Sequence, residues 1–254
     1  MVPQKSIVAH VNVRAMNYAH ELSWYRDFIN QADLVFCDGF GVLLGAKLEG
    51  QSVQSDHRMT CPDYIESLAR ACADADVSIF LLAGQPGVVE RAIAKLKRVA
   101  PRLRIRGHHG HFQKHGSENS AVIEQINRFR PEILYVGFGM PLQERWILDN
   151  IDRIHANVFL PLGACLDFYT GQVYRGPRWM TDRGLEWLTR LATEPSRLWE
   201  RYLVGNPLFF YRVLKEIIQQ EFQPSHLPYC PTCTGVVEIM EKDQEVVQSS
   251  VSSN

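Results

Sequence analysis

The sequence predicts an α/β fold, with a Rossmann-like, mainly parallel sheet covered by helices on both faces and a helical C-terminal appendage. Short apolar runs alternate with segments whose apolar residues recur at helical spacing, and this alternation is typical of a parallel sheet. After about Gly176 the strand-like runs stop, and segments rich in tryptophan, tyrosine, phenylalanine and arginine follow. The first observation predicts the sheet, and the second predicts the appendage.

The expected strands and helices follow one another along the chain. Apolar runs bounded by polar residues or glycines predict strands at residues 6–11, 34–37, 77–82, 103–106, 133–136 and 158–162. Helical periodicity, with proline or polar residues near the start, predicts helices at 14–30, 62–75, 88–99, 118–129 and 143–150. A further helix follows the turn at 38–41, and the appendage has expected helices at 179–192, 195–204 and 207–222.

The length of the chain sets the number of domains. With 254 residues, of which 46% are hydrophobic, it can bury one sizeable core, because domains commonly take about 100 to 200 residues. We expect an α/β domain over residues 1–175, the appendage over 176–222 and a disordered, proline- and serine-containing tail over 223–254.

Composition excludes several classes of function. The formal net charge of -1 disfavours nucleic acid as a partner, because nucleic-acid-binding domains are usually strongly basic. The N-terminus lacks the apolar stretch of a signal peptide, and no run approaches the roughly 18 apolar residues of a spanning helix. The sequence therefore predicts a cytoplasmic protein, which is compatible with attachment to a membrane surface.

The six cysteines have no disulfide-rich spacing. We expect the first four to be reduced and mostly buried; these are Cys37, Cys61, Cys72 and Cys165. Cys230 and Cys233 have the two-residue gap of a zinc knuckle or a redox pair. No second pair completes a four-ligand zinc site, so neither a metal nor a cofactor is expected.

Glycines and polar residues follow the carboxyl ends of the expected strands, which lie along one edge of a parallel sheet. Ligands of open α/β sheets bind at that edge, so we expect these residues to converge on one cleft. The set comprises Asn12, Asp38, Gly84, Gly87, residues 137–143 and residues 163–167.

Asp38 is the sharpest catalytic candidate. A carboxylate at a strand end, beside Gly39 and Gly41, can accept a proton from a bound hydroxyl or hold a ribose. The alternative is that Asp38 only caps the following helix, which is a frequent role of aspartate. The same alternative applies to Asp167, which follows the last expected strand.

Two loops suggest contacts with a ligand. Residues 83–87 resemble a phosphate-cradling turn at a helix N-terminus, and a purely structural turn is an equal alternative. The histidines of the second loop have no acidic residue among them, so contacts with substrate or solvent are favoured over a metal site. These histidines are His108, His109, His111 and His115.

In combination, these motifs resemble the WecG/TagA/CpsF family of bacterial glycosyltransferases over about residues 6–214. Each motif is common alone, but their order and spacing together are specific. The motifs are Asn12, Ala32-Asp33, Asp38-Gly39-Phe40-Gly41, Arg58 with Asp63, residues 83–87, His109-Gly110-His111-Phe112, residues 139–144, Asp167, residues 184–190, Glu194-Pro195 and Arg197.

The resemblance implies transfer of a sugar from a UDP-sugar donor to a polyprenyl-diphosphate-linked saccharide acceptor, with inversion and without an obligatory metal, in exopolysaccharide or teichoic acid synthesis. The donor sugar stays open among N-acetylmannosamine, its uronic acid, glucose and glucuronic acid. By the family pattern Asp38 is the base, while Asn12, Arg58 and Gln143 orient the donor. The other expected substrate-binding residues are His10, Gly84, Gly87, His111, Gly137, Gly139, Asp167, Arg190, Arg197 and Arg201.

The resemblance also links the appendage to the inner face of the cell membrane and to closure of the active site by Arg190, Arg197 and Arg201. The family is often found self-associated, so a homo-oligomer is compatible with the resemblance, and the oligomeric state stays open. Basic residues only slightly outnumber acidic ones in this region. Aromatic side chains interleave with the arginines, which is typical of helices at a lipid interface. Packing of these aromatic residues on the main domain is the alternative.

Three positions depart from the family pattern. His10 stands where threonine is common, Cys61 where glycine is common, and Leu142 where lysine is common. The chain also has almost nothing before the strand at 6–11, where the family usually has a strand and a helix. Two hypotheses follow: an enzyme with a different donor or acceptor sugar, or a catalytically weakened, UDP-sugar-binding relic that acts as a scaffold. A nucleotide-dependent oxidoreductase is a poorer rival, because residues 11–14 contain no glycine.

Overall fold

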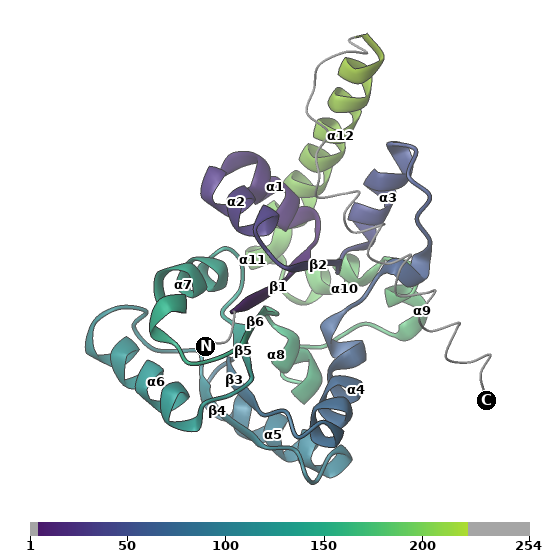
Figure 1. Cartoon of the computed structure of the whole chain (residues 1–254). Coiled ribbons are helices and arrows are strands. Elements are labelled where there is room, and N and C mark those ends of the chain that lie inside the picture. Colours follow the sequence, from purple (N-terminus) through teal and green to yellow (C-terminus); the bar gives the residue numbers. More distant parts are fainter. Residues whose placement is uncertain (1–4, 223–254) are drawn as a thin grey trace, which may run out of the picture.

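A computed structural model describes residues 5–222 (Figure 1). Its strands are β1 (Ser6–Val11), β2 (Leu34–Cys37), β3 (Ile79–Ala83), β4 (Ile105–His109), β5 (Ile133–Gly137) and β6 (Val158–Pro161). Its helices are α1 (Val13–Glu21), α2 (Ser23–Asn30), α3 (Phe40–Leu48), α4 (Cys61–Asp74), α5 (Val88–Val99), α6 (Gly116–Phe129), α7 (Leu142–Asn150), α8 (Cys165–Thr170), α9 (Arg178–Thr181), α10 (Glu186–Thr193), α11 (Pro195–Trp199) and α12 (Gly205–Phe222). Short 3-10 turns lie at Ser55–His57 and Ile151–Arg153. The tail expected to be disordered, with Cys230 and Cys233, lies outside the described residues.

The six strands form one sheet in the order β2-β1-β6-β5-β3-β4, and every neighbouring pair is parallel. Strand β6 is the last in sequence but lies near the middle, where Val158 is opposite both Ser6 of β1 and Ile133 of β5. The predicted α/β fold with a mainly parallel sheet is confirmed. Because the strands share one direction, their carboxyl ends lie at one edge.

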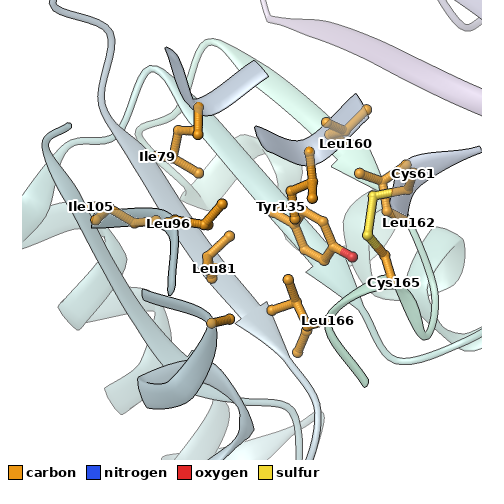
Figure 2. Close-up of a cluster of buried hydrophobic side chains, with 14 of the residues drawn as sticks. Cys61, Ile79, Leu81, Leu96, Ile105, Tyr135, Leu160, Leu162, Cys165 and Leu166 are labelled. Carbon is orange, nitrogen blue, oxygen red and sulfur yellow. A yellow bond between two sulfur atoms is a disulfide. The ribbon is translucent and has the colours of Figure 1, made fainter. Parts of the chain in front are cut away.

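Helices cover both faces of the sheet, and alternating residues of the strands pack against them. Leu81 belongs to the hydrophobic cluster beneath α4, α5 and α8, whereas Phe80 and Leu82 belong to the cluster beneath α1, α2, α6 and α7 (Figure 1). The fully buried ring of Tyr135 lies in the middle of the first cluster (Figure 2).

Several expected elements have different boundaries. The helix expected at 179–192 is two helices, α9 and α10, and Gly184 lies between them with a left-handed backbone (φ 75°). The strand expected at 77–82 is β3, which begins at Ile79. The helix expected at 14–30 is two helices, because the extended backbone of Leu22 (φ -120°, ψ 108°) ends α1 and precedes α2. The break lets both helices bury residues, among them Ala15 of α1 and Tyr25 of α2. Strand β4 extends to His109, beyond the expected end at residue 106, because it pairs with β3 in continuous register.

The appendage ends in a long helical run. The helices expected at 195–204 and 207–222 are continuous, because a π-helical turn at Glu200–Val204 joins α11 to α12. Pro207 lacks the N–H that would bond to the preceding turn, and the π turn ends three residues before it, at Val204. Within residues 5–222, no helix is long and apolar enough to cross a lipid bilayer.

Helix α12 packs on α1 and α3, and it projects beyond them (Figure 1). Phe209 and Val213 are buried there. Gly45 of α3 permits the close approach, because a Cβ at this position would lie 2.8 Å from the ring of Phe209. Asn17 of α1 donates a hydrogen bond to the carbonyl of Gly205 at 2.8 Å. Packing on the main domain is therefore one role of the aromatic residues in the appendage.

Cys61 and Cys165 form a disulfide between the first residues of α4 and α8 (Figure 2). The expectation that the first four cysteines are reduced is wrong for this pair. It is confirmed for Cys37 and Cys72, which are buried and free. The paired cysteines are 104 residues apart in sequence, and folding brings their Cα atoms to 5.8 Å. Local spacing contains no sign of such a pairing.

Candidate active site

A cavity of about 1180 Å³ lies at the carboxyl edge of the sheet, between the strand ends and the appendage. Residues after all six strands contribute to its wall. The structure thus brings together most of the residues that the sequence singled out. They are His10, Asn12, Asp38, Gly84, His111, Gly137, Gly139, Asp167, Arg190, Arg197 and Arg201.

A smaller cavity of about 340 Å³ adjoins the first. Its wall contains Arg58 and apolar side chains, including those of Phe40, Leu44 and Phe210. Asn12 and Asp38 border both cavities, as do Arg190 and Arg201. The two cavities therefore meet at Asp38.

A close approach of two loops sets Asp38 beside Asn12. The N–H of Asp38 donates to the carbonyl of Val11 at 2.8 Å, and a Cβ on Gly39 would lie 2.8 Å from the Cβ of Asn12. Gly39, not Asp38, caps α3, so the capping alternative for Asp38 does not hold. Among residues 5–222 the half-buried carboxylate has no hydrogen bond or ion pair, which leaves it available to a ligand.

Asn12 and Arg58 lie on the cavity walls near this carboxylate, but Asn12 borders both cavities and Arg58 borders only the smaller one. The Oδ1 atom of Asn12 caps α1 by accepting the N–H groups of Arg14 at 3.0 Å and Ala15 at 3.1 Å. Its Nδ2 amide is the group that remains for a ligand. Arg58 is held beside β2 because its backbone pairs with Cys37. Its side chain borders only the smaller cavity.

Gln143 lies beneath the cavity and does not line it. The side chain is fully buried, and its Oε1 atom accepts the N–H groups of Gly139 at 3.1 Å and Gly163 at 2.9 Å. Its Nε2 atom donates to Glu144 at 2.7 Å. The expectation that Gln143 lines the pocket does not hold: the side chain ties the loops after β5 and β6 together. Gly87 is also outside the cavity wall, and it caps α5.

Burial shifts the ionisation of three residues in the larger cavity. Burial lowers the pKa of His10, which Asp38 partly opposes, so the imidazole is neutral at neutral pH. Burial raises the pKa of Asp167, against the influence of His111 and Arg197. Burial also lowers the pKa of Arg201. Asp167 lies within α8 and the cap of that helix is Ala164, so Asp167 is not a helix cap either.

The appendage brings arginines to the cavity. The guanidinium of Arg190 lies 5.0 Å from the ring centroid of Phe168, and its buried Nε has no hydrogen-bond partner. Arg197 instead donates to Glu194 at 2.6 Å. Within the described part of the chain, neither Arg190 nor Arg201 forms an ion pair with a carboxylate. Unpaired guanidinium groups at a cavity favour an anionic ligand.

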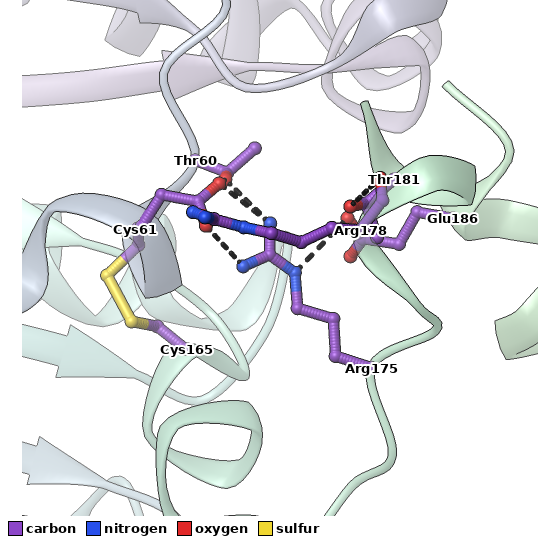
Figure 3. Close-up of polar contacts among 8 residues, drawn as sticks. Thr60, Cys61, Cys165, Arg175, Arg178, Thr181 and Glu186 are labelled. Atoms are coloured by element: carbon purple, nitrogen blue, oxygen red, sulfur yellow. Dashed lines mark hydrogen bonds and ion pairs between the residues drawn. A yellow bond between two sulfur atoms is a disulfide. The ribbon is translucent and has the colours of Figure 1, made fainter. Parts of the chain in front are cut away.

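Arg175 fastens the appendage to the rim of the cavity. It donates to Thr60 at 3.0 Å and contacts Glu186, the first residue of α10, at 3.6 Å (Figure 3). It also binds Asp63 in α4. Because α10 carries Arg190, this contact helps to set the position of that guanidinium.

Sequence reasoning missed two cations that line the larger cavity, Arg14 and Lys114. The Nζ atom of Lys114 lies 3.9 and 4.2 Å from the ring centroids of Phe112 and Phe138, and it donates to the carbonyl of Gly110 at 2.6 Å. Burial lowers the pKa of this ammonium group. Its position in the histidine-containing loop was a usable signal, as was the position of Arg14 two residues after Asn12.

Metal ligands are not gathered at this site. Among residues 5–222, no group of three or more histidine, cysteine, aspartate or glutamate side chains is arranged to hold a metal ion.

Comparisons with known proteins identify the family of this chain. Residues 2–223 match the model of the glycosyl transferase WecG/TagA/CpsF family. The chain is similar to an N-acetylglucosaminyldiphosphoundecaprenol N-acetyl-beta-D-mannosaminyltransferase of Staphylococcus aureus (strain NCTC 8325 / PS 47), with 27% identity over 208 residues, 82% of this chain and 79% of the relative. The protein of the same name from strain MRSA252 is 26% identical over the same shares.

The family match extends over every residue that the structure describes, and the strand-end residues of the matching region line one cavity. The chain therefore belongs to the WecG/TagA/CpsF family of glycosyltransferases.

Proposed function

We propose that this glycosyltransferase moves a hexose-type sugar from a UDP-sugar to a polyprenyl-diphosphate-linked saccharide, with inversion and without an obligatory metal. The observation that carries the proposal is the position of Asp38, whose unpartnered carboxylate borders both cavities. A base at such a junction can reach an acceptor in one cavity and a donor in the other. The larger cavity has room for a nucleotide-sugar, since ligand pockets typically measure about 300 to 1000 Å³.

The reaction then follows from the placement of charge. Asp38 accepts the proton of the acceptor hydroxyl as its oxygen attacks the anomeric carbon, and the bond from that carbon to UDP breaks with the electron pair going to the diphosphate. Arg190 and Arg201 stabilise the charge that develops on UDP. The Nδ2 amide of Asn12 and the guanidinium of Arg58 orient the substrates on either side of the carboxylate.

Glycines at the strand ends leave parts of the cavity wall without side chains. Gly84 and Gly139 border the larger cavity, so a nucleotide-sugar can contact their backbone directly, while His111 and Asp167 contact the nucleotide. Gly137 borders the same cavity but is required by the packing of the protein itself, because a Cβ there would lie 2.5 Å from the carbonyl oxygen of Gly163.

The relatives guide the choice of donor. Their name describes transfer of N-acetylmannosamine to N-acetylglucosaminyl-diphosphoundecaprenol. We therefore place UDP-N-acetylmannosamine first among the donors to be tested, ahead of its uronic acid, UDP-glucose and UDP-glucuronic acid. The polymer that contains the product is a cell-surface polysaccharide or teichoic acid.

The test compares the wild-type protein with Asp38→Asn. Each radiolabelled UDP-sugar is incubated with a short-chain prenyl-diphosphate-N-acetylglucosamine, and labelled lipid product and released UDP are measured. Loss of a general base lowers turnover by about 10²- to 10⁴-fold, while the affinity for UDP should change little. An Asp38→Asn protein that turns over at the wild-type rate would contradict the proposal.

A non-catalytic relic is the second candidate, and specific residues favour it. His10, Cys61 and Leu142, which depart from the family pattern, all line the larger cavity, and Cys61 is joined to Cys165. The same assay distinguishes the two candidates. A wild-type protein that binds UDP without turning over any of the four donors supports the relic.

The appendage suits a location on the inner face of the cell membrane. One side of α12 packs on the main sheet domain, and the other exposes apolar side chains, including Tyr211, Leu214 and Ile218. Their spacing of three and four residues places them on one face of the helix. We propose that this face lies in the lipid interface, near the lipid-linked acceptor. Self-association through the same face is the competing outcome, and sedimentation velocity with and without vesicles separates the two.

A further inference from the structure

Arg14 borders both cavities and projects from the first turn of α1. Its Nε and Nη2 atoms lie 3.0 and 2.7 Å from the hydroxyl oxygen of Tyr18, one turn later in the same helix. A guanidinium has five N–H donors and no acceptor, so these contacts occupy two donors and leave three. Among residues 5–222, Arg14 has no ion pair with a carboxylate.

The surroundings of Arg14 are cationic. Arg190 and Arg201 border the same two cavities. Burial is the main cause that lowers the pKa of Arg201, and the positive charges of Arg190 and Arg14 lower it further, so both of these groups lie within electrostatic reach of Arg201. Like charges in a partly buried site raise the free energy of the unliganded protein.

The nearby acidic side chains do not balance these charges. Glu186 contacts Arg175, and Glu194 contacts Arg197. Among residues 5–222, Asp38 and Glu186 are the carboxylates that border both cavities together with the three guanidinium groups, and Asp167 and Glu118 border the larger cavity alone. Arg14 also acts on the carboxyl group of Glu144, but burial raises the pKa of that group to about 7 and so reduces its negative charge. The buried Nε of Arg190 has no partner. A ligand with two negative charges would satisfy both the charge and the remaining donors.

We propose that Arg14 is a diphosphate-binding residue. In this proposal the Tyr18 hydroxyl is the positioning group, which holds the Arg14 guanidinium in the orientation that binds the diphosphate. The proposal rests on the proposed function, whose donor and acceptor both contain a diphosphate. Arg14 differs from the appendage arginines because it projects from α1, directly after β1. The diphosphate site therefore includes a cation that is held by the main sheet domain and does not depend on closure of the appendage. Since Arg14 borders both cavities, the ligand is either the UDP of the donor or the prenyl diphosphate of the acceptor.

The test measures dissociation constants for UDP, uridine and farnesyl diphosphate by calorimetry. The variants are Arg14→Gln and Tyr18→Phe, and the control is Arg128→Gln, which removes an exposed guanidinium paired with Glu124. Arg14→Gln should weaken UDP, farnesyl diphosphate or both by about 10- to 100-fold, the range for hydrogen bonds to charged groups. Binding of uridine, which has no phosphate, should not change. The ligand that weakens identifies the source of the diphosphate.

Tyr18→Phe should weaken the same ligand by a smaller factor, because the charge of Arg14 stays but its orientation is lost. As the salt concentration rises, the affinity for the weakened diphosphate should fall more steeply in the wild-type protein than in the Arg14→Gln variant. If Arg14→Gln does not fold, Arg14→Lys keeps the charge and loses the planar fork, and a smaller loss with the same ligand selectivity is expected. Arg14 variants that bind both diphosphates as the wild type does would overturn the inference. A wild-type protein that binds neither diphosphate would overturn the proposed function itself.

Discussion

Arg175 donates two hydrogen bonds to the carboxylate of Asp63, at 2.6 and 2.8 Å, across 112 residues of sequence. Thr60 also donates to this carboxylate, so the start of α4 and the start of the appendage share one polar cluster (Figure 3). Bidentate pairs of this kind are both strong and directional. The cluster therefore fixes the entry of the appendage beside the cavity.

Replacing Arg175 by alanine should destabilise the protein by about 1.5 to 3 kcal/mol for the hydrogen bonds to charged groups that are lost. The KM for the donor should rise as well, because α10 is less firmly held. Urea unfolding and steady-state kinetics measure the two effects. Arg70→Ala, which removes an exposed pair with Glu66, is the control and should cost less than about 1 kcal/mol. If the two variants lose the same free energy of unfolding, the structural role of Arg175 is contradicted.

The contact between Arg175 and Asp63 also predicts that the free energy of unfolding falls at acidic pH. The hydrogen bonds from Arg175 hold the pKa of Asp63 below its ordinary value of 3.8, so the folded state binds the proton less tightly than the unfolded state. The stabilisation is therefore complete above about pH 4 and is lost as the pH falls through the folded pKa. The difference between the free energies of unfolding of the wild type and Asp63→Asn should be largest at pH 7 and should shrink as the pH falls below 3.8. A difference that stays constant throughout this acid range would rule out this origin.

The buried carboxyl group of Glu144 predicts the opposite pH dependence, in which the free energy of unfolding falls as the pH rises. The side chain is 1% exposed, and burial raises its pKa from 4.5 to about 7. Its neighbours are Gln143, Tyr25 and, at longer range, Arg14. Stability is highest where the carboxyl is protonated and falls as the pH rises through 7, by roughly 3 kcal/mol in total. Glu144→Gln should remove this slope between pH 5 and 8 in urea unfolding, whereas Glu124→Gln, an exposed control, should keep it.

The Cys61–Cys165 disulfide closes a long loop of chain. Loops of about 100 residues give a stabilisation of up to about 5 kcal/mol in the chain-entropy view. The double variant Cys61→Ala/Cys165→Ala should therefore melt at a lower temperature than the wild type. Reductant should lower the melting temperature of the wild type and leave that of the double variant unchanged. Peptide mass mapping that finds both thiols free in the native protein would remove the basis for this prediction.

The exposed face of α12 predicts binding to lipid vesicles. Leu214 and Ile218 are 49% and 53% exposed, and each buried CH₂ group contributes about 0.8 kcal/mol. Replacing both by serine should weaken partition into anionic vesicles by at least about tenfold while leaving the melting temperature unchanged. Gln219→Ser, an exposed change on the same helix, is the control. Flotation assays measure the partition, and undiminished binding by the double serine variant would exclude this face.

Much of the sheet could be predicted because buried parallel strands are short apolar runs. The run at 133–136 predicts a strand without help from the rest of the fold, and β5 (Ile133–Gly137) lies there. The break at Leu22 was missed because neither glycine nor proline marks it. Periodicity continues across the break, and only the packing of α1 and α2 on the sheet separates the two helices.

The sequence predicts those residues of the site that directly follow the ends of strands. Asn12 and Asp38 follow β1 and β2, and their meeting follows from parallel pairing alone. The burial of Gln143 depends on the adjacency of β5 and β6, which no local pattern encodes. The disulfide and the contact between Arg175 and Asp63 likewise join segments more than 100 residues apart.

The central place of β6 in the sheet has a consequence for synthesis on the ribosome. Until residues 158–161 emerge, β1 and β5 lack the strand that pairs with both of them, and the nascent chain holds two separate half-sheets. Each half-sheet then presents an open, apolar edge, which is prone to pair with other chains. Delayed translation just before this segment would therefore prolong the period in which the newly made protein is most prone to aggregate.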